Sequence, residues 1–188
     1  MYSRILVVGC GGAGKSTLSR RMGELFGIPV VHLDKLWWKE GWTAETEEEF
    51  DRILSRELRK PAWIMDGNYK RTFAERLRYA DFCIVLDVEA SVCIGNVHKR
   101  ARECAGKSRP DMAPGCVEYV SEDFERWIYS YKTEVLPVMM RILQESKVPF
   151  RVFGSCEDAL QKLTEIFQSE DSELSNQVQH SERFRSNK

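Results

Sequence analysis

The residues with the clearest chemical role form a glycine-rich segment near the start of the chain. Residues 9–16 read Gly-Cys-Gly-Gly-Ala-Gly-Lys-Ser, which matches the spacing G-x-x-x-x-G-K-[ST]. Glycines let main-chain amides turn inward toward phosphate oxygens, Lys15 adds a positive charge, and the Ser16 hydroxyl suits Mg²⁺. The segment therefore predicts a phosphate-binding loop for ATP and Mg²⁺. Its expected contacts come from Gly9, Cys10, Gly11, Gly12, Ala13, Gly14, Lys15, Ser16 and Thr17.

The surroundings of this loop support that interpretation. An apolar, strand-like run at 5–8 precedes it, and residues 16–26 follow with apolar side chains at helical spacing. A strand that feeds the loop and a helix that leaves it are the context a nucleotide-binding loop requires. The alternative, a glycine-rich turn that binds nothing, does not predict this arrangement.

Three aspartates directly follow apolar, strand-like runs: Asp34, Asp66 and Asp87. The carboxyl ends of parallel strands meet at one edge of a sheet, where ligands of open α/β sheets bind. A phosphate-binding loop draws a carboxylate from a neighbouring strand to its metal ion. We prefer Asp66 as the partner of Ser16, because Gly67 behind it allows close approach. The alternative for each aspartate is a cap of a helix or turn.

Asp34 stands beside three tryptophans, Trp37, Trp38 and Trp42. A carboxylate next to aromatic faces suits an acceptor substrate, because it can orient or deprotonate a hydroxyl while a ring stacks. Packing of the tryptophans against the body of the protein is an equally good interpretation, since aromatic side chains bury large areas either way.

A basic cluster lies at the end of a helical stretch and in the loop that follows. Its arginines could close over a triphosphate as a lid and stabilise the transferring phosphoryl group. The alternatives are a solvated helix face or a phosphate patch for nucleic acid. The candidate catalytic arginines are Arg100, Arg102 and Arg109, with Lys99 and Lys107 near them and Asp111 just behind.

Strand-like and helix-like segments alternate along the chain, which predicts a parallel sheet with helices on both faces. We therefore expect an α/β, three-layer P-loop NTPase fold with five parallel strands in one domain, residues 1–168, with a lid at about 99–118. Pro137 should kink the longest helix. The polar segment 169–188 is expected to be disordered. Strands are expected at 5–8, 29–33, 63–65, 82–86 and 150–153, and helices at 16–26, 46–60, 70–78, 91–102, 121–143 and 155–167.

Charge and composition limit the classes of binding partner that we expect. The 188 residues include 28 Lys and Arg against 29 Asp and Glu, a net charge of −1, which gives no electrostatic support for nucleic-acid binding. The apolar run at the start of the chain is too short for a signal peptide, and no apolar run in the sequence is long enough to cross a bilayer. We expect a cytoplasmic protein with no membrane partner, whose six cysteines are reduced thiols.

Beyond the loop, several segments carry a resemblance. Residues 32–38 (His-Leu-Asp-Lys-Leu-Trp-Trp), 63–69 (Trp-Ile-Met-Asp-Gly-Asn-Tyr) and 107–112 (Lys-Ser-Arg-Pro-Asp-Met) are similar to the bacterial DNA topology modulation protein family. The likeness covers about residues 3–167. That family is related to adenylate kinase, so the resemblance implies a nucleoside-monophosphate-kinase-like fold, ATP with Mg²⁺ and an arginine-bearing lid.

The chain departs from adenylate kinases at one point. Asn68 and Tyr69 stand where those enzymes continue Asp-Gly with Phe-Pro-Arg, so Arg71 or Arg76 would have to bind a monophosphate. The resulting hypothesis is an ATP-dependent kinase acting on an unidentified nucleotide- or nucleoside-like small molecule. The alternatives are a nucleotide-switched regulator that affects DNA topology and an ATPase without an acceptor. The oligomeric state stays open. Candidate substrate contacts are Asp34, Trp37, Trp38, Trp42, Asn68 and Arg71.

Overall fold

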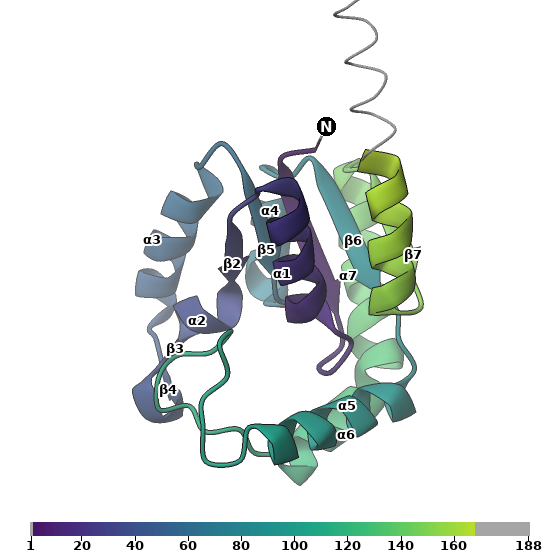
Figure 1. Ribbon diagram of the computed structural model, residues 1–188. Helices are drawn as coiled ribbons and strands as arrows, with labels where there is room; N and C mark the ends of the chain where they lie inside the picture. Colours follow the sequence, from purple (N-terminus) through teal and green to yellow (C-terminus); the bar gives the residue numbers. More distant parts are fainter. Residues whose placement is uncertain (1, 168–188) are drawn as a thin grey trace, which may run out of the picture.

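A five-stranded parallel sheet with the strand order β2-β5-β1-β6-β7 forms the centre of the protein (Figure 1). The expected α/β fold with five parallel strands is confirmed. The computed structural model describes residues 2–167, so the tail predicted at 169–188 lies outside the described residues. The strands are β1 (Arg4–Gly9), β2 (Val30–His32), β5 (Trp63–Asp66), β6 (Phe82–Leu86) and β7 (Phe150–Phe153).

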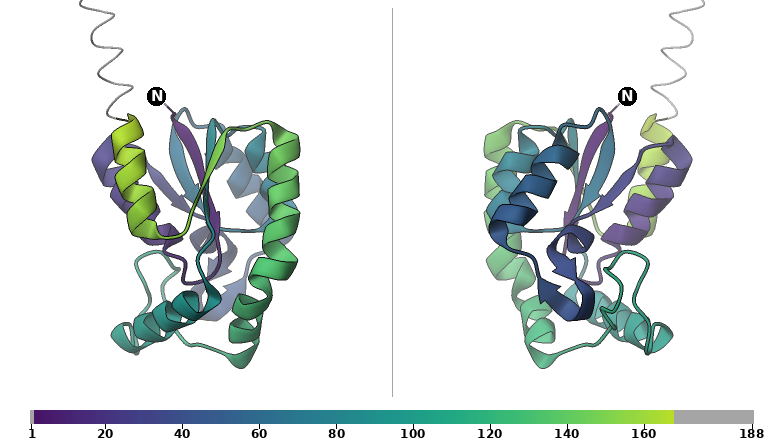
Figure 2. Two further views of the ribbon diagram at one scale, coloured as in Figure 1. Left: turned by 90° about the vertical axis from the view of Figure 1, so that its right-hand side faces the viewer. Right: turned by 90° about the vertical axis from the view of Figure 1, so that its left-hand side faces the viewer.

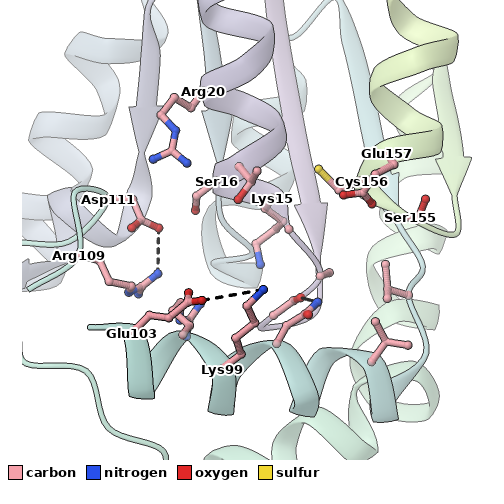
Figure 3. A pocket seen from close by; sticks show the side chains of 18 of the residues that line it. Lys15, Ser16, Arg20, Lys99, Glu103, Arg109, Asp111, Ser155, Cys156 and Glu157 are labelled. Atoms are coloured by element: carbon pink, nitrogen blue, oxygen red, sulfur yellow. Dashed lines mark hydrogen bonds and ion pairs between the residues drawn. The ribbon is translucent and has the colours of Figure 1, made fainter. Parts of the chain in front are cut away.

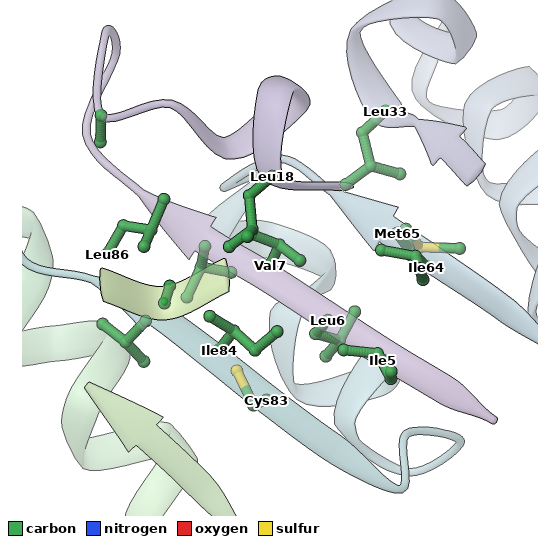
Figure 4. Packing of buried hydrophobic residues seen from close by; sticks show 14 of the residues in the cluster. Ile5, Leu6, Val7, Leu18, Leu33, Ile64, Met65, Cys83, Ile84 and Leu86 are labelled. Atoms are coloured by element: carbon green, nitrogen blue, oxygen red, sulfur yellow. The ribbon is translucent and has the colours of Figure 1, made fainter. Parts of the chain in front are cut away.

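The strand that leads into the glycine-rich loop lies in the middle of the sheet. β1 pairs with β5 on one side and with β6 on the other, so that Ile5 stands opposite Ile64 and Phe82. Ile5, Leu6 and Val7 are fully buried, as an unbroken apolar run predicts for a central strand covered on both faces (Figure 4). This burial fixes the position where the chain enters the loop.

Helices cover both faces of the sheet (Figure 2). Helix α1 and the last helix, 156–167, lie on one face, and α4 and α7 pack together on the other. Helices α5 and α6 cross below the carboxyl ends of the strands (Figure 1). The longer helices are α1 (Lys15–Phe26), α3 (Glu47–Leu58), α4 (Lys70–Leu77), α5 (Ala90–Glu103), α6 (Glu122–Ser130) and α7 (Leu136–Ser146). Across residues 2–167, none is both long enough and apolar enough for a membrane span.

The segment around β2 differs from the predicted strand at 29–33. β2 ends at His32, and Asp34 lies in the first turn of a short helix, α2 (Leu33–Trp37), rather than at a strand end. A small hairpin follows, in which β3 (Trp38–Lys39) pairs with β4 (Thr43–Ala44). The hairpin is closed by η1 (Glu40–Trp42), where Gly41 has a φ of 69°. β2 is an edge strand that pairs only with β5, and its regular strand geometry ends at His32.

The helix predicted over 121–143 is two helices. A π-helical turn, η2 (Tyr131–Val135), separates α6 from α7. The interruption predicted at Pro137 therefore lies just before it. Pro137 has no N–H to donate to the turn above it, and the wider turn accommodates that loss. The Tyr131 side chain is buried at this turn.

The loop between α5 and α6 packs on the β3–β4 hairpin through a small core of its own. Met112, Ala113 and Cys116 lie against Trp38 and Trp42. The Trp42 indole N–H donates to the Val117 carbonyl at 2.9 Å, and the Cys116 thiol donates to the Lys39 carbonyl at 3.2 Å. We call residues 104–121 the lid loop. These contacts tie it to the segment that carries Asp34. All six cysteines of the chain have free thiols.

Candidate nucleotide-binding site

The glycine-rich loop takes a conformation that needs its glycines. Gly14 caps α1 with a φ of 92°, in the left-handed region that favours glycine. Gly12 has a φ of 81°, and a Cβ added there would lie 2.3 Å from the Cys93 carbonyl oxygen. The loop therefore passes close to the first turn of α5 and ends at the amino terminus of α1, where main-chain N–H groups can bind phosphate.

Two asparagines from other parts of the chain hold the loop through its main chain. The Asn68 amide bonds Gly9 twice: its nitrogen donates to the carbonyl at 2.8 Å and its oxygen accepts from the N–H at 3.1 Å. Asn96 donates to the Gly12 carbonyl at 2.9 Å. The structure thus brings Asn68, predicted as an acceptor contact, to the loop itself. The Cys10 thiol contacts Cys93, and this contact with burial raises its pKa, so Cys10 supplies the loop with main chain only.

Beside the loop lies a cavity of about 680 Å³, within the size range of ligand pockets (Figure 3). Its walls come from α1, α5, the lid loop and residues 154–157. Gly12, Ala13, Gly14, Lys15, Ser16 and Thr17 of the loop all line it. Residues 154–157 were not predicted to be part of a site; they follow β7, and only the sheet order places them opposite the loop.

Lys15 occupies the centre of the site. Its ammonium group donates to the Cys10 carbonyl at 2.9 Å, within the loop. Burial lowers the pKa of Lys15, and the nearby carboxylates of Asp34 and Asp66 act in the opposite direction. The ammonium is therefore held within the loop, near enough to both carboxylates for their charges to act on it, and it offers a positive charge to a phosphate group.

The structure brings together Ser16 and Asp66, the two residues predicted to hold a metal ion. The Ser16 hydroxyl lies 3.5 Å from Asp66 Oδ1, and His32 Nδ1 lies 2.7 Å from the other carboxylate oxygen. Among residues 2–167, no group of three or more His, Cys, Asp or Glu side chains is arranged to hold a metal by itself. The Ser16–Asp66 pair fits Mg²⁺, which binds proteins through few oxygen ligands and takes others from phosphates and water. Asp87 instead lies 3.5 Å from Lys132.

His32 was not predicted as a site residue. It stands opposite Asp66 in the parallel register of β2 and β5, which brings the imidazole to the carboxylate. A histidine in an apolar strand gives no sign of such a partner, because the register depends on the whole sheet. The imidazole leaves Oδ1 of Asp66 turned toward Ser16.

The structure places Asp34, a predicted acceptor contact, beside Tyr69. The Tyr69 hydroxyl donates to Asp34 Oδ1 at 2.8 Å. Removal from water raises the pKa of Asp34, while the bond from Tyr69 and the charge of Lys15 partly oppose that rise. A carboxylate with a raised pKa is better able to take a proton from a hydroxyl.

The tryptophans near Asp34 are engaged in packing. Trp37 makes edge contacts with Phe50 and Tyr69, at ring distances of 5.4 Å and 6.1 Å. Trp38 and Trp42 contact each other at 5.4 Å and hold the lid loop. Of the two interpretations left open by the sequence, these contacts favour packing.

Arg71, also predicted as a substrate contact, lies apart from this group. It is exposed on α4, and its guanidinium binds the Asp51 carboxylate of α3 at 2.7 Å. The structure therefore does not bring Arg71 together with Asp34, and the surface ion pair occupies it.

The predicted lid arginines separate into two groups. Arg100 and Arg109 line the cavity, whereas Arg102 is exposed on α5 and lies outside the cavity wall. Both cavity arginines pair with Glu118, a buried residue that was not predicted as part of the site. A glutamate in a loop rich in Gly and Pro carries no signal of burial, since only the folded lid encloses it.

Comparisons with known proteins give information on the fold. No protein-family model and no curated protein sequence matches the chain. Among solved structures it is similar to shikimate kinase from Acinetobacter baumannii in complex with shikimate, with TM-score 0.59 and 18% identity over 89% of this chain and 94% of that one. Shikimate kinase from Bacteroides thetaiotaomicron gives TM-score 0.53 and 16% identity over 89% and 99%. Deoxyadenosine kinase from M. mycoides with bound dATP gives 0.50 and 13% over 87% and 98%. The chain thus shares the fold of these solved kinase structures.

The buried side chain of Arg76 holds the backbone segment that follows β5. It is fully buried, which lowers its pKa to about 10, and it donates to the carbonyls of Gly67, Asn68 and Tyr69. Arg76→Met should lower the free energy of unfolding by about 3 kcal/mol, because it leaves buried carbonyls without donors. Urea denaturation measures this change. The exposed Arg56→Met is the control and should change stability by less than about 0.5 kcal/mol; equal stability of both variants would contradict the role of Arg76.

Proposed function

We propose that the protein is an ATP-dependent small-molecule kinase that transfers the γ-phosphoryl group to a hydroxyl acceptor. The observation that carries this proposal is the enclosed Asp34 carboxylate, which accepts from Tyr69 at 2.8 Å and whose charge, like that of Asp66, acts on the Lys15 ammonium of the loop. A phosphate held at Lys15 then has a metal pair on one side and a candidate base on the other. Hydrolysis alone does not need a second carboxylate that is enclosed and bonded by Tyr69.

On the donor side, the loop amides and Lys15 bind the β and γ phosphates. Ser16 and Asp66 are the residues that would hold Mg²⁺, which neutralises phosphate charge when bound. Arg100 and Arg109 reach the same cavity and add positive charge where the transferring group gains negative charge.

On the acceptor side, Asp34 orients the hydroxyl and takes its proton. The acceptor oxygen forms a bond to the γ-phosphorus while the bond from that phosphorus to the bridging oxygen breaks, which leaves ADP. The lid loop, tied to the β3–β4 hairpin, excludes water from the transfer. Asp34 is fixed for this role by Tyr69, whose hydroxyl occupies one carboxylate oxygen.

A nucleotide- or nucleoside-like compound remains our candidate acceptor, and the relation to adenylate kinase and to the DNA topology modulation family remains part of the proposal. Arg71 and Arg76 are both engaged elsewhere, which disfavours an ordinary nucleoside monophosphate. Free cysteines fit a cytoplasmic location. Neither the charge balance nor the contacts of the described residues favour the DNA regulator.

The test is an acceptor panel assayed with Mg-ATP. Purified protein is incubated with nucleosides, nucleotides, sugars and hydroxy acids, and ADP release is measured together with phosphorylated product by mass spectrometry. At least one compound should raise ADP release about a hundredfold or more above the rate without acceptor, since positioned acid–base groups contribute that much.

The panel also separates the alternatives. ADP release that no compound accelerates, with free phosphate as the only product, would instead support an ATPase. Tight, salt-dependent binding of duplex DNA that ATP modulates, with no phosphorylated product, would favour a nucleotide-switched regulator.

A further inference from the structure

The two arginines that line the cavity from the lid side share one buried carboxylate. Glu118 stands near the end of the lid loop with its side chain 3% exposed. Arg100 Nε donates to Glu118 Oε1 at 2.8 Å, and Arg109 Nε faces Oε2 at 2.6 Å as an ion pair. A buried carboxylate is tolerated where such partners offset its loss of water. Glu118 therefore fixes both guanidinium groups, one from α5 and one from the lid loop.

The guanidinium group of Arg109 pairs with two carboxylates, one on each of two edges. Its Nε edge faces Glu118, and its Nη1 donates to Asp111 Oδ2 at 2.9 Å (Figure 3). Arg109 and Asp111 line the cavity, whereas Glu118 does not. The two carboxylates thus differ in position: Glu118 lies behind the arginine, and Asp111 lies on the side of the cavity.

The surroundings of Asp111 favour its ionised form. Its carboxylate forms an ion pair with Arg109, with Nη1 at 2.9 Å from Asp111 Oδ2. An ionised carboxylate on the cavity side of an arginine has the charge and the two-oxygen geometry that a phosphate group presents to a guanidinium. Asp111 and a phosphate group would therefore compete for the same edge of Arg109.

We propose that Glu118 is a positioning residue that holds Arg100 and Arg109 toward the γ-phosphate, and that Asp111 takes the place on Arg109 that a γ-phosphate oxygen takes. This inference rests on the proposed binding of ATP at the loop, but not on any acceptor. Two arginines that converge on one phosphate repel each other, and Glu118 offsets that repulsion from behind. Removal of the two carboxylates should then have opposite effects on recognition of the γ-phosphate.

The test compares Kd values for ATP and ADP, measured by calorimetry with EDTA so that no metal contributes. Glu118→Gln should reduce the preference for ATP over ADP about tenfold, the equivalent of one charge-assisted hydrogen bond. Asp111→Asn should increase that preference severalfold, because an uncharged amide oxygen competes more weakly than a carboxylate for the Nη edge of Arg109. Adding Glu118→Gln to an Arg109→Gln variant should reduce the preference by less than it does in the wild type.

Either of two other results would overturn the proposal. A shift of the ratio in the same direction in both variants would indicate a general charge effect, and an unchanged ratio in Glu118→Gln would remove the positioning role. Asp81→Asn is the matched control, because it breaks a carboxylate–arginine pair with Arg4 far from the cavity, and it should leave the ratio unchanged.

Two further outcomes are distinguishable. If circular dichroism shows that Glu118→Gln does not fold, Glu118→Asp replaces it; this variant keeps the charge but is too short to contact both arginines, and it should show a smaller reduction of the ratio. Wild-type protein that binds ATP but phosphorylates no acceptor would contradict the proposed function while the ratios still decide this inference. Wild-type protein that does not bind ATP would overturn both.

Discussion

The Lys15→Met variant is expected to lose about a thousandfold in kcat with the best acceptor, the cost typical of removing a preorganised charge from the transferring group. Methionine keeps the length and apolar stem of the side chain but removes the ammonium that donates to the Cys10 carbonyl and on which the charges of Asp34 and Asp66 act. The loop should keep its shape, since Asn68 and Asn96 hold it through main-chain atoms.

Three measurements accompany this prediction: kcat by ADP release, Kd for ATP by calorimetry, and the midpoint of thermal unfolding. Lys60→Met removes an exposed lysine that pairs with Glu57, and it serves as the control with unchanged kcat. The midpoint of Lys15→Met should not fall, because a lysine with a burial-lowered pKa is costly to keep charged. A variant that retains wild-type kcat would contradict the placement of phosphate at this loop.

The parts of the site that the sequence predicts are those encoded by local pattern. The loop at residues 9–16 is one continuous motif, and the strand before it and the helix after it follow from periodicity alone. The pairing of Ser16 with Asp66 needed only the rule that parallel strands end at the same edge. The observed strand order β2-β5-β1-β6-β7 places β5 directly beside β1, which brings Asp66 at the end of β5 close to the loop that follows β1.

The parts that the sequence does not predict depend on partners far along the chain. Asn68 bonds Gly9 across a separation of 59 residues, and Arg71 finds Asp51 on a neighbouring helix. Each of these side chains has a type that suits a substrate as well as a structural partner. The pairing of β1 with β5 decides this for Asn68, and the contact between α3 and α4 decides it for Arg71; no local spacing contains that information.

Glu118 shows the same limit on the lid. Between Gly115 and Ser121 it has the appearance of a solvated loop residue, yet Arg100 and Arg109 enclose it. The enclosure depends on the lid loop folding onto Trp38 and Trp42, which are aromatic residues that the sequence predicts equally well as substrate contacts. The tryptophans thus contribute to the site indirectly, through the position of the lid.

The Asp34→Asn variant should bind ATP within about threefold of wild type but lose about 10²–10⁴-fold in kcat, the contribution of a positioned general base. Asparagine can still accept the hydrogen bond from Tyr69, so the local geometry is kept while the proton acceptor is lost. Asp51→Asn, which removes an exposed carboxylate paired with Arg71, is the control and should keep wild-type kcat.

The pH dependence of this variant separates a base from a structural carboxylate. Burial raises the pKa of Asp34 above its ordinary value of 3.8, so wild-type kcat should keep increasing with pH above the usual carboxyl range, whereas the residual rate of Asp34→Asn should not follow that titration.

The stability of the folded protein should change with pH in the opposite sense. Because the pKa is higher in the folded state than in the unfolded state, the protonated carboxyl favours folding, and that contribution is complete below 3.8 and is lost as pH rises through the folded pKa. The free energy of unfolding of wild type should therefore fall across this window relative to Asp34→Asn, which has no group to ionise. Parallel stability curves for the two proteins would show that Asp34 is not enclosed as described, and identical kcat profiles would remove it from proton transfer.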